Sequence, residues 1–475
     1  MKKTIITLFC ALASLLTTQA QEALSLDSCV AMALRSNREI REAQLKSEQY
    51  RHTRKAYFAN FLPDLSARVI DIQSFNGTQS LSVDLLDVVP ASTTAALQQM
   101  VPTLAQTWAQ LTGQPFPAEM LSGLDHNVSL DYKIGNVFHG SVTLTQPLYM
   151  GGKISAAYRM SQLGERMAQL GMQLTEDEVI VQTHEAYSLL LQATQMHEVA
   201  VSYDSLLNKL LTDVQNAERH GLRSHNDVLK VQVKKSEAEL QILQARNGIR
   251  LAQMNLCHYI GLPLGEDIRV QEIAVSDDQA MALRASVKGP DRNLSLRPEY
   301  NLLDLKSQLA AQQVKLTRSD FLPQLALMAN YGYTNGVEVM DQKLLHKPGA
   351  VLAVNLTVPI YHGGEAQHKV KAARLEYERT VIEQQDLVEK LNLELQQSAN
   401  QLEEAILEVE ITHKTLDQAA DNLRSSRKAF DLGMEPLSDL LEAQTLWQQA
   451  YARKAMAECS LIVAEVKYRK ACGTL

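Results

Sequence analysis

Three carboxylates beside two short turns are the side chains whose types and spacing best suit binding chemistry. Asp439 and Glu442 lie three residues apart where a helical pattern resumes after the second turn, so they project from one helical face. Asp227 holds the matching place after the first turn. Carboxylates gathered in a ring favour cations, whereas the helix dipole alone explains an Asp in the first turn of a helix. Both interpretations stay open for these residues.

The histidines do not form a catalytic constellation. His220 and His225 flank the first turn without a Cys or a supporting carboxylate motif beside them, which favours a solvated turn over a metal site. The run His-Asn-Asp at 225–227 has hydrolase-like residue types, yet no Gly-x-Ser-x-Gly elbow accompanies it. His413 falls on an apolar helical stripe and is expected to be a core histidine. We therefore expect no catalytic residue, no metal site, no cofactor and no enzymatic activity.

The N-terminus has the features of an export signal. Lys2 and Lys3 form a basic start, residues 5–16 are an apolar core, and small residues precede an expected cut after Ala20. Cys10 lies inside that apolar core, which argues against a lipid-attachment site. Later in the chain no stretch has the roughly 18 uninterrupted apolar residues of a spanning helix, so any membrane span must be β.

The mature chain is acidic and poor in cysteine. Without Lys2 and Lys3, 44 of the 46 basic residues remain against 54 acidic ones, a net charge of about −10 that argues against a nucleic-acid partner. The spacing of the four remaining cysteines suits neither a zinc site nor a dense disulfide framework. We expect them to be small core residues, with one disulfide as the alternative. They are Cys29, Cys257, Cys459 and Cys472.

The chain contains one unit twice. Residues 146–152 and 358–364 share Pro-x-Tyr-x-Gly-Gly and lie 212 residues apart, each between an alternating apolar run and a long helical pattern. An earlier block, from Glu39 to Pro63, recurs 260 residues later. The second copy therefore lacks 48 residues that the first copy has between Pro63 and Pro147. Everything else is in register, which indicates duplication.

Each copy reads as a helix, a strand pair and a long helical hairpin. The first helix of each copy ends at Phe-Leu-Pro because proline cannot continue it, and the strands alternate with period two, as in a sheet with one apolar face. The expected helices span about 26–60 and 297–320, the strands about 65–73, 128–146, 325–334 and 350–360, and the hairpins 153–261 and 365–475.

These elements define the expected domains. A signal peptide at 1–20 precedes a first repeat at 21–261, a linker at 262–296 and a second repeat at 297–475. The 48 extra residues belong to a long loop at about 74–126, between the two strands of the first repeat.

Apolar residues recur in alternating steps of three and four along the first helix of each hairpin. A helix of nearly 70 residues would reach on the order of 100 Å, so this stripe favours a coiled coil over packing in a globular core. The stripe comprises Ala186, Leu189, Ala193, Met196, Ala200, Tyr203, Leu207, Leu210, Val214 and Ala217, then Leu395, Ala399, Leu402, Ile406, Val409, His413, Leu416, Ala420 and Leu423. The turns at 221–227 and 433–439 begin with a glycine that ends one helix, and Asn, Ser or Asp can cap the next.

Two strand pairs make only four strands. An open sheet edge in lipid would leave backbone groups unpaired, and the smallest membrane barrels need about eight strands. Two, three or four chains would supply eight, twelve or sixteen. Three is attractive because two hairpins per chain then place six around a ring, although the residues alone leave the number open.

The ordered set of motifs over residues 24–475 resembles the TolC-like outer membrane efflux protein family. It consists of the signal, two repeats, both Pro-x-Tyr-x-Gly-Gly junctions, and turns followed by Asp-Val-Leu-Lys-Val-Gln and Asp-Leu-Leu-Glu-Ala-Gln. The resemblance implies a mainly α chain with a small β part, in the outer membrane of a Gram-negative bacterium. It further implies a homotrimer whose twelve strands form one β-barrel in lipid, continued by a periplasmic α-helical coiled-coil tunnel. A periplasmic adaptor (membrane fusion protein) and an inner-membrane transporter are the implied partners.

The resemblance also assigns roles to particular residues. Asp439, Glu442 and, more weakly, Asp227 would form a pore constriction. The family's latch positions match Phe430, which lacks a hydroxyl, and Glu435, which is acidic where the family is basic, so this chain departs from the family's latch. The adaptor-docking tips would be Gly221, Leu222, Gly433 and Met434, and the barrel-to-tunnel junctions Pro147, Gly151, Gly152, Pro359, Gly363 and Gly364. The 74–126 loop would face the cell exterior, and the 262–296 linker would wrap the tunnel near its equator.

The sequence is compatible with three functions. The first is the outer-membrane channel of a tripartite efflux system. The second is a protein-secretion outlet of the same fold, which only the cognate transporter distinguishes. The third, from a different class, is a structural periplasmic coiled coil without a pore.

Overall fold

The computed structural model describes residues 23–73, 81–82, 129–130, 132–273, 282–285, 294–339, 342–343 and 348–475. The expected signal peptide at 1–20 and nearly all of the expected 74–126 loop lie outside these residues. Within the described part of the chain, no helix combines the length and the apolar character needed to cross a membrane.

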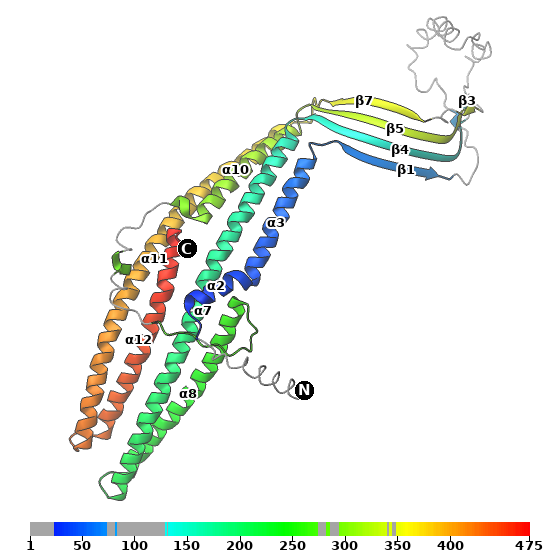
Figure 1. Ribbon diagram of the computed structural model, residues 1–475. Coiled ribbons are helices and arrows are strands. Elements are labelled where there is room, and N and C mark those ends of the chain that lie inside the picture. Colours follow the sequence, from blue (N-terminus) through cyan, green and yellow to red (C-terminus); the bar gives the residue numbers. More distant parts are fainter. Residues whose placement is uncertain are drawn as a thin grey trace, which may run out of the picture. The chain divides into compact units, whose positions relative to one another are not determined.

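The two copies have the same order of elements, except that two helices instead of one precede the strands of the first copy (Figure 1). In the first copy these are α2 (Leu26–Ser36), α3 (Arg38–Ala59), β1 (Asp64–Ile72), β4 (Tyr132–Met150), α7 (Lys153–Arg219) and α8 (His225–Ile260). In the second they are α10 (Pro298–Ser319), β5 (Gln324–Val339), β7 (Gly349–Thr357), α11 (Glu365–Asp431) and α12 (Leu437–Cys472). The long helices α7 and α11 have 67 residues each, and α8 and α12 have 36 each. The mainly helical fold with a small β part is confirmed.

Short elements complete the described chain. They are β2 (Leu81–Ser82), β3 (Ser129–Leu130), β6 (Gln342–Lys343) and the 3-10 helix η1 (Leu294–Leu296). The chain divides into two compact units. One is helical and comprises the described parts of 1–54, 159–314 and 371–475, and the other comprises those of 55–158 and 315–370, with the sheet and the adjoining helix ends.

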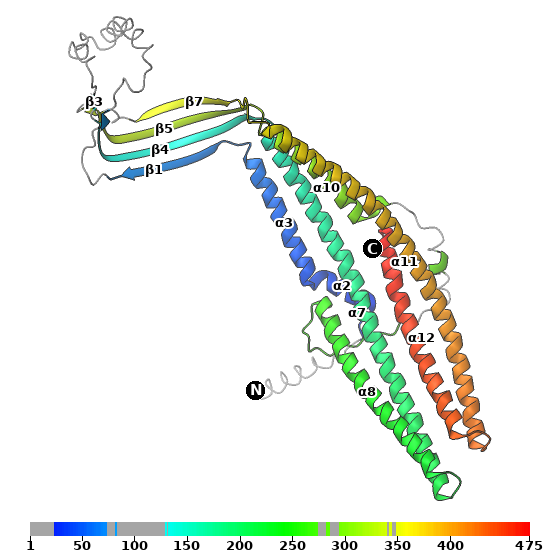
Figure 2. The same ribbon diagram turned by 180° about the vertical axis from the view of Figure 1, so that it is seen from behind.

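The sheet joins the two copies through β4 and β5. All its pairings are antiparallel, in the order β1-β4-β5 with β7 on the other edge of β5. The strand pair of each copy is therefore adjacent to that of the other, as the ribbon shows from both sides (Figure 2). The strands β1 and β7 are the outer members of this set, and every residue in both is exposed.

The two faces of the sheet differ in polarity. On one face, His139 Nδ1 hydrogen-bonds Thr334 Oγ1 at 2.7 Å, and Asn330 Nδ2 donates to Thr143 Oγ1 at 2.7 Å. Register places alternate residues on the opposite face. That face carries Val142, Leu144, Ala329, Tyr331, Leu352 and Val354. The period-two alternation seen in the sequence thus yields one apolar face.

The Pro-x-Tyr-x-Gly-Gly junction differs between the copies. Pro147 was expected to end its strand, but β4 continues to Met150 because a register shift between Pro147 and Tyr149 accommodates the missing N–H and pairing with β5 then resumes. In the second copy β7 ends before Pro359. All four junction glycines have positive φ, namely Gly151 and Gly363 at 61°, Gly152 at 87° and Gly364 at 85°. Each junction therefore leads from strand to helix through two left-handed residues.

The first helix of the first copy is broken, contrary to the single helix expected at about 26–60. Asn37 ends α2 with an extended backbone, and its side-chain oxygen accepts the Glu39 N–H at 2.8 Å, which starts α3. The Asn37 amide also donates to the Tyr259 carbonyl at 3.1 Å. A polar side chain that satisfies backbone groups on both sides thus makes a bend that helical periodicity does not reveal.

The helical unit is held by apolar clusters along the hairpins. Leu207 and Leu210 are fully buried, as the heptad stripe predicts. The predicted burial of Leu189 is wrong, because this residue is 48% exposed and Tyr187 is buried instead. The Tyr187 hydroxyl donates to the Gln271 carbonyl at 2.6 Å, which explains its inward position. One of these apolar clusters joins all four long helices near the turns, through Leu210, Val231, Phe430 and Leu440.

One contact repeats at the base of both hairpins. Gly261 and Gly473 end α8 and α12 with φ of 77° and 71°. A Cβ on Gly261 would lie 2.9 Å from the Ser36 carbonyl oxygen, and one on Gly473 would lie 3.2 Å from the Leu296 carbonyl oxygen. Ser36 and Leu296 are equivalent under the 260-residue offset, and the glycines under the 212-residue offset. The duplication therefore extends to tertiary contacts.

Candidate functional site at the hairpin tips

Both hairpins turn in the same way. In the first, Leu222 N donates to the Ala217 carbonyl at 2.8 Å, and in the second, Met434 N donates to the Ala429 carbonyl at 2.9 Å. Together with a left-handed glycine, this bond ends a helix as a Schellman motif. Gly221 and Gly433 supply that conformation, with φ of 71° and 73°, and nothing lies within 4 Å of a Cβ built on either. Backbone conformation, not crowding, requires glycine there.

The turns present apolar side chains to solvent. Leu222 and Met434 are each 76% exposed, and Leu432 is 75% exposed. The expected docking residues therefore lie together at the turns. Sequence reasoning missed Leu432, because a leucine before the terminal glycine resembles the last core residue of a helix. Exposed leucines at such a tip suit contact with an apolar partner surface.

The carboxylate of Asp227 is occupied by its own helix. Ser224 Oγ accepts the Asp227 N–H at 3.2 Å, and the Ser224 N–H donates to Asp227 Oδ2 at 3.4 Å, which is a capping box. The Ser224 hydroxyl also donates to that oxygen at 2.9 Å, and Lys230 Nζ lies 3.7 Å from the other. These bonds explain an acid at this position without a pore.

The second tip leaves its carboxylates more available. Pro436 occupies the N-cap of α12 and makes no side-chain cap bond. Within the described part of the chain, the Asp439 carboxylate accepts only the Ser438 hydroxyl at 2.9 Å, and both Asp439 and Glu442 are exposed. Neither has an ion pair among the residues that the structure describes. The carboxylate of Asp439 at the start of α12 is therefore less engaged by its own helix than that of Asp227 at the start of α8.

A groove runs between the second helices of the two hairpins. It has a volume of about 570 Å³ and is lined by Asn226, Leu229, Lys230, Val233 and Lys234 of α8 and by Ser438, Leu441, Glu442 and Thr445 of α12. Its wall combines three apolar side chains with two lysines on α8 and one glutamate on α12. Further along, Gln448 Nε2 donates to Gln241 Oε1 at 2.6 Å and holds the two helices together. No single stretch of sequence reveals this groove, because its walls come from different copies.

Two contacts tie one hairpin to the other at the tips. The Arg223 guanidinium lies over the Phe430 ring, 4.5 Å from the centroid. Arg427 of α11 pairs with Asp213 of α7, and its Nε also lies 3.2 Å from Asp431. Phe430 cannot make the family's hydroxyl bond, but it is buried and meets a cation instead. The first-hairpin partners of this tie were not found from the sequence.

Two of the three histidines singled out in the sequence, His225 and His413, make polar side-chain contacts. His225 Nδ1 lies 2.8 Å from Glu218. His413 is partly exposed and not a core histidine, because its Nε2 reaches Glu458 at 2.9 Å, and Lys454 pairs with the same carboxylate at 2.8 Å. Among the described residues, no group of three or more His, Cys, Asp or Glu could hold a metal ion.

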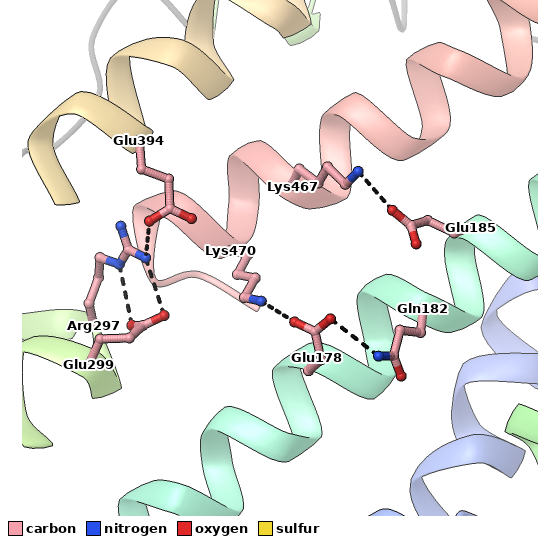
Figure 3. A network of polar contacts seen from close by, with 8 residues as sticks. All are labelled: Glu178, Gln182, Glu185, Arg297, Glu299, Glu394, Lys467 and Lys470. Atoms are coloured by element: carbon pink, nitrogen blue, oxygen red, sulfur yellow. Dashed lines mark hydrogen bonds and ion pairs between the residues drawn. The ribbon is translucent and has the colours of Figure 1, made fainter. Parts of the chain in front are cut away.

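Far from the tips, ion pairs join the repeats (Figure 3). Lys470 of α12 pairs with Glu178 of α7, and Lys467 Nζ lies 2.7 Å from Glu185. Nearby, the fully buried Arg297 sits between two glutamates. Its Nη2 lies 2.8 Å from Glu394 of α11 and 3.2 Å from Glu299 of α10. These contacts hold the bases of the helices while the tips carry the exposed groups.

The chain resembles channel proteins in sequence and in fold. The family model "Outer membrane efflux protein" matches residues 120–262 and 290–474, which include both hairpins. The alkaline protease secretion protein AprF of Pseudomonas aeruginosa is 23% identical over 343 residues, covering 70% of this chain and 69% of AprF. The outer membrane protein TolC of Escherichia coli is 21% identical over 382 residues, covering 76% of this chain and 75% of TolC.

Solved structures show the same fold. The CmeC outer membrane channel of Campylobacter jejuni superposes with a TM-score of 0.72 at 17% identity, over 94% of this chain and 85% of CmeC. At that identity the likeness concerns the fold alone.

Proposed function

Because the chain belongs to the outer membrane efflux protein family, we propose that it is the outer-membrane channel of a tripartite export system. The match to both hairpins is the observation that carries this proposal. Members of this family are outer-membrane channels and not enzymes, and the same is proposed here. The substrate would come from an inner-membrane transporter through a periplasmic adaptor and would leave to the exterior.

The channel is a homotrimer in this proposal. One chain supplies two strand pairs with outer strands β1 and β7, and an unpaired strand edge is costly in lipid. Three chains would pair these edges in a ring of twelve strands. The helical hairpins would then continue the barrel as a coiled-coil tunnel in the periplasm.

The outer-membrane lipid would contact the apolar sheet face and the junctions. Tyr149 pairs with Leu325, which pairs with Leu356, so this row extends the apolar face to the first junction. In the second junction, Ile360 and Tyr361 are highly exposed. Tyrosine suits the membrane–water interface, where its ring is buried and its hydroxyl is hydrated. Such contacts support a role for the junctions at the lipid boundary.

Adaptor docking belongs to the tips. Leu222, Leu432 and Met434 offer exposed apolar side chains next to rigid glycine turns. An adaptor helix with apolar residues at i, i+3 and i+4 would fit both these tips and the adjoining groove between α8 and α12. The lysines and Glu442 of that groove would set its orientation.

The gate lies at the same end of the tunnel. Asp439 and Glu442 of three chains would form an acidic ring that favours cations, while Asp227 has a weaker claim because its capping box uses the carboxylate. The Arg223–Phe430 and Arg427–Asp213 contacts would hold the tips together in a closed state. Opening would separate the hairpins and break both contacts.

The cargo class has two candidates. Efflux of small molecules is the first. Secretion of proteins is the second, favoured by the similarity to AprF, whose name assigns it to alkaline protease secretion. Co-purification with a cross-linked transporter would separate the two, because the transporter class determines what enters the duct.

The direct test of the channel is conductance. Detergent-purified full-length protein is expected to run as a heat-modifiable trimer and to give cation-preferring single-channel currents in planar lipid bilayers. A soluble periplasmic species without conductance would overturn the proposal and favour a structural coiled coil.

A further inference from the structure

Two of the four cysteines of the mature chain share one core. Cys29 of α2 and Cys257 of α8 are both 0% exposed and belong to the same apolar cluster, where α2 packs against α8. Cys459 belongs to another cluster, and Cys472 is partly buried near Tyr468. A disulfide needs two sulfurs within bonding reach. In the structure all four thiols are free, and Cys29 and Cys257 are the two that share a cluster.

Small side chains allow the two helices to approach closely. Ala33, one turn along α2 from the buried thiol, is also 0% exposed. At the end of α2, Asn37 donates to the Tyr259 carbonyl at 3.1 Å. A Cβ on Gly261 would lie only 2.6 Å from the Ser36 Cβ, so the chain just after α8 touches the end of α2. The helices that carry the two thiols are therefore joined by a tight backbone contact at their ends.

The folded chain protects both thiols from exchange. Burial, and next the nearness of Cys257, raises the pKa of the Cys29 thiol to about 11. Burial, and next Glu266, raises the pKa of the Cys257 thiol, whose Sγ lies 3.8 Å from the Glu266 carbonyl oxygen. Because the thiolate is the reactive form, thiols in this state exchange slowly. Oxidation would have to precede the docking of α2 onto α8.

We propose that Cys29 and Cys257 form a disulfide during folding after export, fastening α2 to α8 at the base of the first hairpin. The proposal rests on the proposed function only through export into an oxidising compartment. The two thiols give up two protons and two electrons as the new S–S bond forms. The oxidant is a disulfide-bearing thiol oxidoreductase, whose own S–S bond breaks as it leaves as a dithiol.

Thiol counting tests this bridge in the full chain. Whole cells are quenched with acid, the protein is denatured in excess maleimide, and its intact mass is measured with and without prior reduction. Two of the four thiols are expected to be labelled without reductant, and four after it. A peptide map should join the peptides that contain Cys29 and Cys257. Because labelling is done on denatured protein, the number of free thiols can also be measured in variants that fold poorly.

Two variants separate this pair from other pairings. Cys29→Ala should raise the number of labelled thiols without reductant from two to three, because Cys257 loses its partner. The matched control Cys459→Ala should lower it to one, because the bridge persists and a free thiol is gone. In hydrogen exchange, a reductant should speed exchange of the α2 amides in the wild type and have no further effect in Cys29→Ala.

Labelling of all four thiols in unreduced protein would overturn the bridge, as would a cross-linked peptide that joins any other two cysteines. Fractionation and conductance are measured separately on the same strain. A protein that conducts in bilayers with four free thiols refutes the disulfide and leaves the channel proposal standing.

Discussion

The guanidinium of Arg223, in the turn of the first hairpin, lies over the ring of Phe430 near the end of α11, 4.5 Å from its centroid. The two residues come from different copies of the duplicated unit. The ion pair between Arg427 and Asp213 joins the same two hairpins. In the proposed gate, parting the tips would break both contacts, so the two would oppose opening together.

Arg223→Ala should raise the open fraction of the channel. A cation–π contact whose cation is partly exposed contributes about 0.5–1 kcal/mol, so its loss should shift the closed-to-open equilibrium about two- to fivefold for each chain of the trimer. Single-channel recording measures this as open probability. Arg424→Ala is the matched control, because among the described residues Arg424 pairs only with Asp421 on its own helix at 3.2 Å, and its loss should leave gating unchanged. Equal open probability in wild type and Arg223→Ala would remove this contact from the gate.

Asp439→Asn combined with Glu442→Gln should lower the cation preference severalfold and weaken block by multivalent cations. The reason is that six carboxylates would leave the constriction of a trimer. Reversal potentials in a salt gradient measure the selectivity. Unchanged reversal potentials would exclude both residues from the narrow part of the pore.

Asp227→Asn provides the contrast at the first tip. Its carboxylate completes the capping box with Ser224, so loss of the charge should destabilise the start of α8 by about 0.3–1 kcal/mol and leave selectivity nearly constant. Hydrogen exchange of the first turn of α8 measures the first effect. A selectivity change as large as that of the Asp439 variant would assign Asp227 to the constriction as well.

Gly151→Ala should impair assembly more than Gly363→Ala. Both positions have φ of 61°, which costs alanine about 1–2 kcal/mol. At Gly151 a Cβ would also lie 2.7 Å from the Ser319 carbonyl oxygen, whereas nothing lies within 4 Å at Gly363. The yield of heat-modifiable oligomer measures assembly. Equal yields from the two variants would mean that crowding at Gly151 is relieved by relaxation.

Removing the acids around Arg297 should cost more than removing Arg297. In Glu299→Gln with Glu394→Gln, a guanidinium that is 2% exposed loses both countercharges, which costs about 3–5 kcal/mol. Arg297→Met should cost less, because the Glu394 side chain is 49% exposed and can be hydrated. Thermal unfolding followed by circular dichroism compares them. A larger loss in Arg297→Met would contradict this asymmetry.

Much of the fold could be predicted because each sequence motif occurs in both copies of the duplicated unit. The Phe-Leu-Pro stops, the junction glycines and the glycine turns recur at fixed offsets, so weak local signals supported one another. Helical periodicity also predicted the buried Leu207 and Leu210. It failed at Leu189, where the hydroxyl of Tyr187 reaches the Gln271 carbonyl and turns the neighbouring face inward. That partner lies outside the helix and leaves no periodic trace.

The site was predicted less completely than the fold. The tip glycines and acids could be predicted because turns and helix caps depend on a few neighbouring residues in the sequence. The groove walls, Leu229 of α8 and Leu441 of α12, belong to different copies, and Arg223 meets Phe430 across a similar separation. Pairings of this kind depend on how two hairpins pack, and one sequence carries no record of it. His413 shows the same limit, since its partner Glu458 lies on another helix.

The two turns also differ in the hydrogen bonds that their equivalent acids, Asp227 and Asp439, make. In the first copy Ser224 engages Asp227, while in the second Pro436 stands at the same place and leaves Asp439 with only a neighbouring hydroxyl. A ring of identical hairpins would have to use each such acid both to stabilise its helix and to face the solute. With two unequal copies in one gene, one acid can stabilise its helix while the other is available to face the solute. Evolution can then adjust charge at one turn without loosening the other.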